Sequence, residues 1–169
     1  MELTYTLRPL KDGDAPRMLE WMQDERLTAY LQIGGKNTTM ESVRGFIAAA
    51  QKDGENLHRA IVDEQDVYYG TVSLKHIDHE KGEAEYAIAM HRDGMGTGAA
   101  RQGSEQIFLL AAREQKLKRL YLYVRRDNVR AVRFYEKMGW ARFEHGECDS
   151  GLFWYEKGLC DALTCGADA

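Results

Sequence analysis

The sequence predicts a single domain of mixed α/β class, in which about seven strands form one sheet and about four helices cover its faces. Its 169 residues fit one domain, since typical domains have roughly 100–200 residues. Hydrophobic residues make up 44% of the chain and charged residues 30%, the balance of an ordinary globular protein. Strand-like and helix-like patterns follow one another without an internal repeat or a linker, and this order predicts the α/β architecture.

The N-terminal part predicts one strand followed by two helices. The strand covers residues 5–10 and runs into a Lys-Asp-Gly turn. Asp14 is a typical helix N-cap, and Pro16 suits the first turn of the helix that Asp14 would start. Thr38 and Glu41 have the spacing of a capping box, so a second helix is expected to begin there.

Three strands are expected next. Residues 60–63 and 67–75 are rich in β-branched and aromatic side chains and flank a polar turn, which predicts a hairpin. Residues 83–90 form another strand, in which Glu83 and Glu85 share one face because side chains alternate along a strand.

The C-terminal half predicts two helices and three more strands. A helix begins near Ala99, a strand covers residues 120–124, a helix runs from Asn128 to Gly139, and residues 141–148 and 151–159 close the sheet. Glycine is a common residue directly after a helix, because it tolerates positive φ. We expect one domain over residues 1–160 and a C-terminal tail over residues 161–169, where no periodicity is visible.

The charge is unevenly distributed. The net charge is -4, yet the stretch from His91 to Arg142 holds twelve Lys or Arg and five Asp or Glu, a net charge of +7. The remainder of the chain therefore carries -11. A basic block inside an acidic protein argues against wholesale coating of nucleic acid and favours one local anionic ligand. The alternative is that these charges lie on solvated faces of surface helices.

Other features of the sequence favour a cytoplasmic protein with no membrane partner. No apolar run approaches the roughly 20 residues that a membrane span needs. The N-terminus lacks the basic and apolar regions of a secretory signal. Three cysteines, an odd number, do not form a disulfide framework, and we expect them to be free thiols.

A glycine-rich turn lies between the strand at 83–90 and the helix that follows. Gly96 and Gly98 let the backbone curl around a ligand, and the helix N-terminus near Ala99 adds amides and the positive end of its dipole. This arrangement suits a phosphate group. The Gly-Lys-Ser/Thr ending of a nucleoside triphosphate loop is absent, and NADP remains an alternative on the strength of Arg125 and Arg126.

Two stretches resemble motifs of the GNAT superfamily of N-acetyltransferases. Residues 95–100, Met-Gly-Thr-Gly-Ala-Ala, resemble its acyl-coenzyme-A binding motif, except that Met95 stands where the family has Gln or Arg. Arg92 or Arg101 is the expected substitute for that contact. Residues 128–140 are similar to a second family motif, Asn-x-x-Ala-x-x-x-Tyr-x-x-x-Gly-Phe, with tryptophan in the final position. The opening Leu-Arg-Pro-Leu at 7–10 resembles the branch that contains ribosomal-protein N-terminal acetyltransferases.

The resemblance implies a mostly antiparallel sheet and a two-substrate reaction in which a primary amine attacks acetyl-coenzyme A (acetyl-CoA) directly. Glu85 is the implied base and Tyr135 the implied acid for the departing thiolate, with Glu83 as the alternative base. The implied coenzyme contacts are Ile88, Ala89, Met90, Met95, Gly96, Thr97, Gly98, Ala99, Ala100, Arg101 and Asn128. A non-catalytic acyl-CoA binding or sensing module of the same fold is the alternative function.

The acceptor is less constrained than the donor. The resemblance allows a small-molecule amine or the N-terminus of a peptide or protein, bound between the N-terminal helices and the closing strands, and it implies a homodimer. The acidic remainder of the chain suits a cationic amine. Residues 76–80, His-Ile-Asp-His-Glu, could suggest a metal site, but no further ligand has a familiar spacing, so we expect a solvated loop and no metal.

Overall fold

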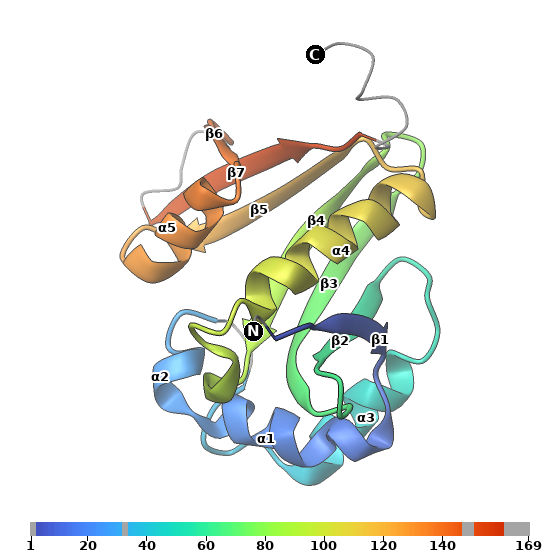
Figure 1. Cartoon of the computed structure of the whole chain (residues 1–169). Coiled ribbons are helices and arrows are strands. Elements are labelled where there is room, and N and C mark those ends of the chain that lie inside the picture. The colour runs from blue at the N-terminus through green and yellow to red at the C-terminus, as the bar shows by residue number, and fades with distance from the viewer. Residues whose placement is uncertain (1–2, 32–33, 147–150, 161–169) are drawn as a thin grey trace.

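The computed structural model describes residues 3–31, 34–146 and 151–160, and its centre is a seven-stranded sheet (Figure 1). The strands are β1 (Thr6–Pro9), β2 (Leu57–Val62), β3 (Tyr68–Asp78), β4 (Glu83–Met90), β5 (Arg119–Arg125), β6 (Ala141–Phe143) and β7 (Leu152–Gly158). The helices are α1 (Ala15–Gln23), α2 (Glu25–Thr28), α3 (Met40–Ala49), α4 (Ala99–Arg113) and α5 (Val129–Lys137), with short 3₁₀ turns η1 (Asp12–Asp14) and η2 (Arg92–Gly94).

The sheet has the spatial order β1-β2-β3-β4-β5-β7-β6. Neighbouring strands are antiparallel except for β4 and β5, which run parallel. The predicted class, a mixed and mostly antiparallel sheet flanked by helices, is confirmed.

Several boundaries differ from the sequence-based expectations. The sheet begins earlier at β2 and continues to Asp78 at the end of β3, because antiparallel pairing holds polar residues that have no strand pattern of their own. The four-residue helix α2 is too short to produce a helical periodicity and was not expected. The strand expected over 141–148 reaches only Phe143, and its end at 147–150, like the tail at 161–169, lies outside the described residues.

The helix caps also differ in detail. Thr39, not Thr38, caps α3, and its hydroxyl accepts a hydrogen bond from the Ser42 amide at 3.1 Å. Asp14 precedes α1 as expected, but its side chain makes no cap bond. Both of its carboxylate oxygens instead accept from the Arg8 guanidinium, at 2.7 and 2.8 Å. This charge-assisted pair ties β1 to the start of α1.

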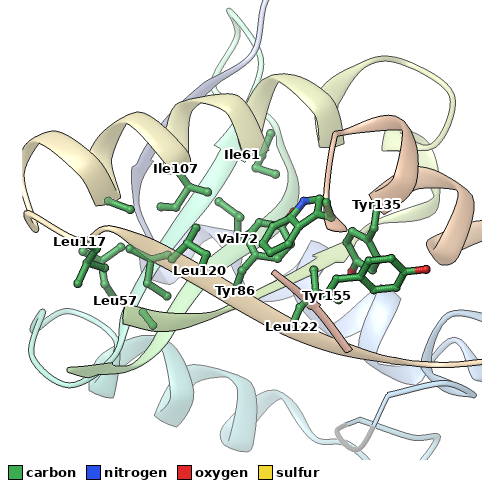
Figure 2. Close-up of a cluster of buried hydrophobic side chains, with 14 of the residues drawn as sticks. Leu57, Ile61, Val72, Tyr86, Ile107, Leu117, Leu120, Leu122, Tyr135 and Tyr155 are labelled. Atoms are coloured by element: carbon green, nitrogen blue, oxygen red, sulfur yellow. The ribbon is translucent and has the colours of Figure 1, made fainter. Parts of the chain in front are cut away.

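Two hydrophobic cores lie on opposite faces of the sheet. The larger lies under α4 and α5 and contains Ile61, Tyr86, Ile107, Leu120 and Tyr155 (Figure 2). The other lies under α1 and α3 and includes Ala60, Val62 and Tyr68. Residues 60–62 alternate between the two cores, because successive side chains of a strand point to opposite faces.

The feature that creates room for a ligand is a split between β4 and β5. Their parallel pairing covers only Glu83–Arg119, Ala84–Leu120 and Glu85–Tyr121. Beyond Glu85 the two strands diverge, with α5 on one side of the opening and α2 on the other (Figure 1). Beyond Glu85, the backbone N–H and C=O groups on the facing edges of β4 and β5 therefore do not bond to each other. They are available to a ligand.

One glycine next to this split is required by packing. A Cβ at Gly70 on β3 would lie 2.7 Å from the Ala89 carbonyl oxygen and 2.6 Å from the Met90 sulfur. Because the backbone of β4 cannot move aside freely, we expect Gly70→Ala to lower the free energy of unfolding by about 1–3 kcal/mol. Urea unfolding measures this. Gly45→Ala is the control, because its Cβ would meet no atom within 4 Å in α3 and helix propensity favours alanine. Equal stability of the two variants would contradict the packing argument.

Two further expectations from the sequence, on membrane spans and on cysteines, can be compared with the structure. Among the described residues, no helix is long and apolar enough to cross a membrane. Cys160 is disulfide-bonded, so the expectation that all three cysteines are free thiols is wrong.

Candidate active site

A cavity of about 950 Å³ occupies the split between β4 and β5. Its walls come from α1, α2, the end of β4, the glycine-rich turn, β5 and α5. Of the residues expected to bind or process the coenzyme, those that line it are Ile88, Ala89, Met90, Met95, Gly96, Gly98, Ala100, Arg101, Asn128 and Tyr135. The fold therefore brings residues from two separate motifs to one space.

The glycine-rich turn has the positive-φ glycines and the following helix that the sequence predicts. Gly96 and Gly98 have φ of 73° and 91°, conformations that favour glycine, and Gly98 is the N-cap of α4. Gly98 offers no side-chain cap, and the first turn of α4 has no acidic residue. A 15-residue helix with such an N-terminus suits a phosphate oxygen.

Thr97 and Ala99 do not line the cavity but hold the turn in shape. The Thr97 hydroxyl donates to the Gly94 carbonyl at 2.6 Å and accepts from the Ala99 amide at 3.2 Å. These bonds fix the direction in which the turn enters α4. Arg92 and Arg101, the expected substitutes for the polar residue missing at Met95, both line the cavity.

Asn128 begins the second motif. Its side-chain oxygen accepts a hydrogen bond from the Ala131 amide at 3.3 Å, which confirms its role as the N-cap of α5. Gly139 follows α5 with φ of 88°, as expected for the residue after a helix C-terminus.

Tyr135 on α5 lines the cavity and packs among the rings of Tyr86, Trp140 and Tyr155. Figure 2 shows it in the hydrophobic core with Tyr86 and Tyr155. The side chain is largely buried, and within the described part of the chain its hydroxyl has no hydrogen-bond partner. Burial raises the pKa of the Tyr135 phenol well above its ordinary value of 10.0, because desolvation disfavours the phenolate. The group therefore remains protonated at neutral pH and can donate to a ligand.

Glu85 lies at the point where β4 and β5 separate. It shares a row of the sheet with Lys75 on β3 and Tyr121 on β5, and its carboxylate lies 3.3 Å from the Lys75 ammonium. Glu85 is 8% exposed and is not among the residues lining the cavity. Strand alternation places it on the face opposite Tyr86, so Glu85 and Tyr135 approach the split from opposite faces of the sheet.

Glu83, the alternative base, has a different environment. Its carboxylate pairs with the Arg119 guanidinium at 2.9 Å, and Arg119 also pairs with Glu156 at 2.9 Å. This network lies where β4 and β5 are still paired, two rows farther from the opening than Glu85. The placement favours Glu85 over Glu83 as the carboxylate nearer to a ligand.

His91 is a buried residue at the site that the sequence reading did not single out. It follows β4 directly and is 1% exposed. Its Nδ1 accepts a hydrogen bond from the Asp93 amide at 3.0 Å, so Nε2 carries the proton and donates to the Glu20 carboxylate at 2.5 Å. This bond connects α1 to the 3₁₀ turn that precedes the glycine-rich turn. A lone histidine after a strand has no sequence pattern that indicates such a contact.

The stretch at 76–80 contributes nothing to this site. Its first three residues belong to β3 rather than to a loop, and the side chains of His76 and His79 are exposed. Across the described ranges, no three His, Cys, Asp or Glu side chains are grouped so as to hold a metal ion.

Because of buried tyrosines near the site, we expect the free energy of unfolding to fall at alkaline pH. Desolvation raises the pKa of Tyr68, Tyr86 and Tyr135 above the ordinary value of 10.0. A raised pKa in the folded state means that stability is complete below about pH 10 and falls above it, by up to about 1.4 kcal/mol per pH unit for each group. Urea unfolding from pH 8 to 11 measures the decline. Tyr135→Phe should make it shallower, and an unchanged slope would contradict this assignment.

Comparisons with known proteins agree with this geometry. A family model described as the acetyltransferase (GNAT) domain matches residues 5–141. No curated protein matches the chain significantly. Among solved structures, the spermidine N-acetyltransferase from Vibrio cholerae in complex with CoA and spermine is similar, with 20% identity, coverage of 95% of this chain and 98% of that chain, and a TM-score of 0.81.

A second solved structure, a GNAT-family acetyltransferase from Bacillus anthracis, is 17% identical and covers 94% of this chain and 98% of its own, with a TM-score of 0.78. Identities this low show a shared fold, whereas the family model spans most of the chain. The split sheet, the glycine-rich turn and the family match lead to one conclusion: the chain belongs to the GNAT acetyltransferase family.

Proposed function

We propose that the chain is an N-acetyltransferase that transfers the acetyl group of acetyl-CoA, the cosubstrate of this family, to a primary amine. One observation carries the proposal: Gly96 and Gly98 of the glycine-rich turn and Tyr135 of α5 line a single cavity. A coenzyme with its phosphates at the glycine-rich turn would extend its pantetheine arm along the unpaired edge of β4, at Ile88, Ala89 and Met90.

The proposed reaction is a direct transfer. The amine nitrogen attacks the thioester carbonyl carbon, the new C–N bond forms and the C–S bond breaks. Glu85, directly or through water, takes the proton that the nitrogen loses. Tyr135 donates its phenolic proton to the departing thiolate, and backbone amides at the end of β4 stabilise the oxyanion.

Coenzyme binding and turnover are tested together. At one hundred times its Kd, CoA should stabilise the protein by about 2.7 kcal/mol, which raises Tm by roughly 5–10 °C. NADPH at the same concentration should leave Tm unchanged. Free thiol release with acetyl-CoA and a panel of amines then separates an enzyme from a sensing module. Stabilisation without turnover on any amine would favour the sensor, and no stabilisation by CoA would refute both.

The finer assignments are part of this proposal. Resemblance at residues 7–10 supports a peptide N-terminus as one acceptor class, in the manner of ribosomal-protein N-terminal acetyltransferases. We further propose that residues 1–160 form the catalytic domain, that the protein is a homodimer, and that it is located in the cytoplasm.

A further inference from the structure

Most of the exposed large apolar side chains in the described part of the chain line the cavity. Among the described residues, the large hydrophobic side chains that are exposed are Leu3, Tyr30, Leu31, Leu109, Tyr123 and Val129. Four of these six line the cavity, namely Tyr30, Leu31, Tyr123 and Val129. Exposed apolar groups that gather in a hollow typically mark a surface that contacts a ligand.

The aromatic members of this group are held in place. The Arg125 guanidinium lies 5.3 Å from the centre of the Tyr30 ring and donates to the Ala29 carbonyl at 3.3 Å. Tyr123 packs against Trp154, with ring centroids 5.1 Å apart. These contacts keep two aromatic faces at the opening, and Trp21 and Leu27 continue the apolar wall inward.

The carboxylates of the cavity are already engaged. Within the described lining there are two, Asp24 and Asp127. Asp24 caps α2 by accepting from the Arg26 amide at 3.0 Å. Asp127 accepts from Arg125 through both oxygens, at 3.1 and 2.8 Å.

The same lining carries four arginines, at positions 26, 92, 101 and 130, so its formal charge is positive. A positive cavity complements the phosphates of CoA. The expectation that the acidic remainder of the chain selects a cationic amine therefore finds no support in the residues that line the cavity.

We propose that the acceptor is a primary alkyl monoamine that carries an aromatic ring, which packs against Tyr30, Leu31 and Tyr123; this inference rests on the proposed acetyltransferase function. Glu85 supplies the base for the attacking nitrogen from the last paired row of the split, and the acceptor class depends on the side chains at the opening. The ring gains apolar and aromatic contact at the opening. A polyamine has several ammonium groups, whereas both carboxylates in the described lining of the cavity already accept hydrogen bonds from the chain.

This acceptor class differs from that of the similar structure from Vibrio cholerae, which was solved with spermine. Shared fold at 20% identity leaves the acceptor side free to differ, because specificity is determined by the side chains of the cavity. An aromatic monoamine has two sources, a free arylalkylamine or the N-terminal phenylalanine of a peptide, and both offer the same ring and amine.

The test compares acceptors with the intact protein. Thiol release with acetyl-CoA is followed for 2-phenylethylamine, tryptamine, a Phe-Gly amide, propylamine, putrescine and spermidine. We expect kcat/KM for the aromatic monoamines to exceed that for propylamine and for the polyamines at least about tenfold, as burial of an aromatic ring predicts. The ratio between 2-phenylethylamine and Phe-Gly amide identifies the source.

Variants of the exposed apolar residues test whether this preference for aromatic acceptors comes from the cavity. Tyr30→Ala should raise KM for 2-phenylethylamine about tenfold and leave KM for acetyl-CoA unchanged, whereas Tyr30→Phe should retain the wild-type value because it keeps the ring. Leu109→Ala is the matched control, since Leu109 is an exposed apolar residue of α4 that does not line the cavity. Equal effects of Tyr30→Ala and Leu109→Ala would overturn the proposal.

The outcomes separate the two proposals. If spermidine or putrescine turns over faster than every aromatic monoamine, the acceptor class is wrong and the acetyltransferase function stands. If no amine releases thiol although CoA stabilises the protein, both are overturned.

Discussion

Replacing Tyr135 with phenylalanine is expected to lower kcat about a hundredfold or more, with little change in KM for acetyl-CoA. General acid catalysis contributes typically 10²–10⁴-fold, and the variant removes the proton donor while keeping the ring. The hydroxyl has no partner in the described structure, so its loss breaks no internal hydrogen bond. Folding should therefore be preserved, and the change should affect the chemical step alone.

A neighbouring tyrosine provides the control. Tyr155 lies on β7 with its ring centroid 6.3 Å from that of Tyr135, but its hydroxyl donates to Glu136 and it does not line the cavity. Tyr155→Phe should leave kcat within about threefold of the wild type. Because the pKa of Tyr135 is raised above 10, the wild-type rate should show no decline from ionisation of this phenol below that pH. A Tyr135→Phe enzyme within threefold of wild type would contradict the proposed acid.

Glu85→Gln is expected to reduce kcat/KM about a hundredfold near neutral pH, since it removes the carboxylate that accepts the amine's proton. The isosteric amide preserves the size of the side chain. The deficit should shrink as pH rises, because more of the amine enters the reaction already deprotonated. Measurement of kcat/KM from pH 6 to 10 for both enzymes reveals this convergence.

Glu83→Gln distinguishes between the two candidate carboxylates. Because Glu83 is paired with Arg119 in the row farther from the opening, we expect this variant to lose stability more than activity. A hundredfold loss in Glu83→Gln together with a near-normal Glu85→Gln would move the base to Glu83. Equal and small effects in both would indicate that water alone accepts the proton.

Local sequence patterns predicted most of the fold. Alternation of side chains located the strands, and Asn128 and Gly139 marked the two ends of α5, because a cap depends on residues within one turn. Local patterns did not predict the elements whose structure depends on pairing or packing with another segment of the chain. The long end of β3 and the short helix α2 are both of this type.

The candidate site divides in the same way. Gly96, Gly98 and Tyr135 belong to motifs that can be read from the sequence alone. Tyr30 and Tyr123 could not be assigned to the cavity, because an aromatic residue in a helix or strand is equally typical of a core. Their place at the opening depends on α2 and β5 meeting across the split.

The sequence by itself determined the family, through two stretches that resemble known motifs. It also determined the mixed sheet and the glycine-rich turn, because these depend on glycine conformations, caps and periodicities within short segments. Only the tertiary structure decided which carboxylates are engaged and which apolar side chains stay exposed. It also showed that the described residues that line the cavity carry more arginines than carboxylates, although the chain outside the basic block has a net charge of -11. Charges far apart in the chain act on a ligand only through the positions that folding gives them.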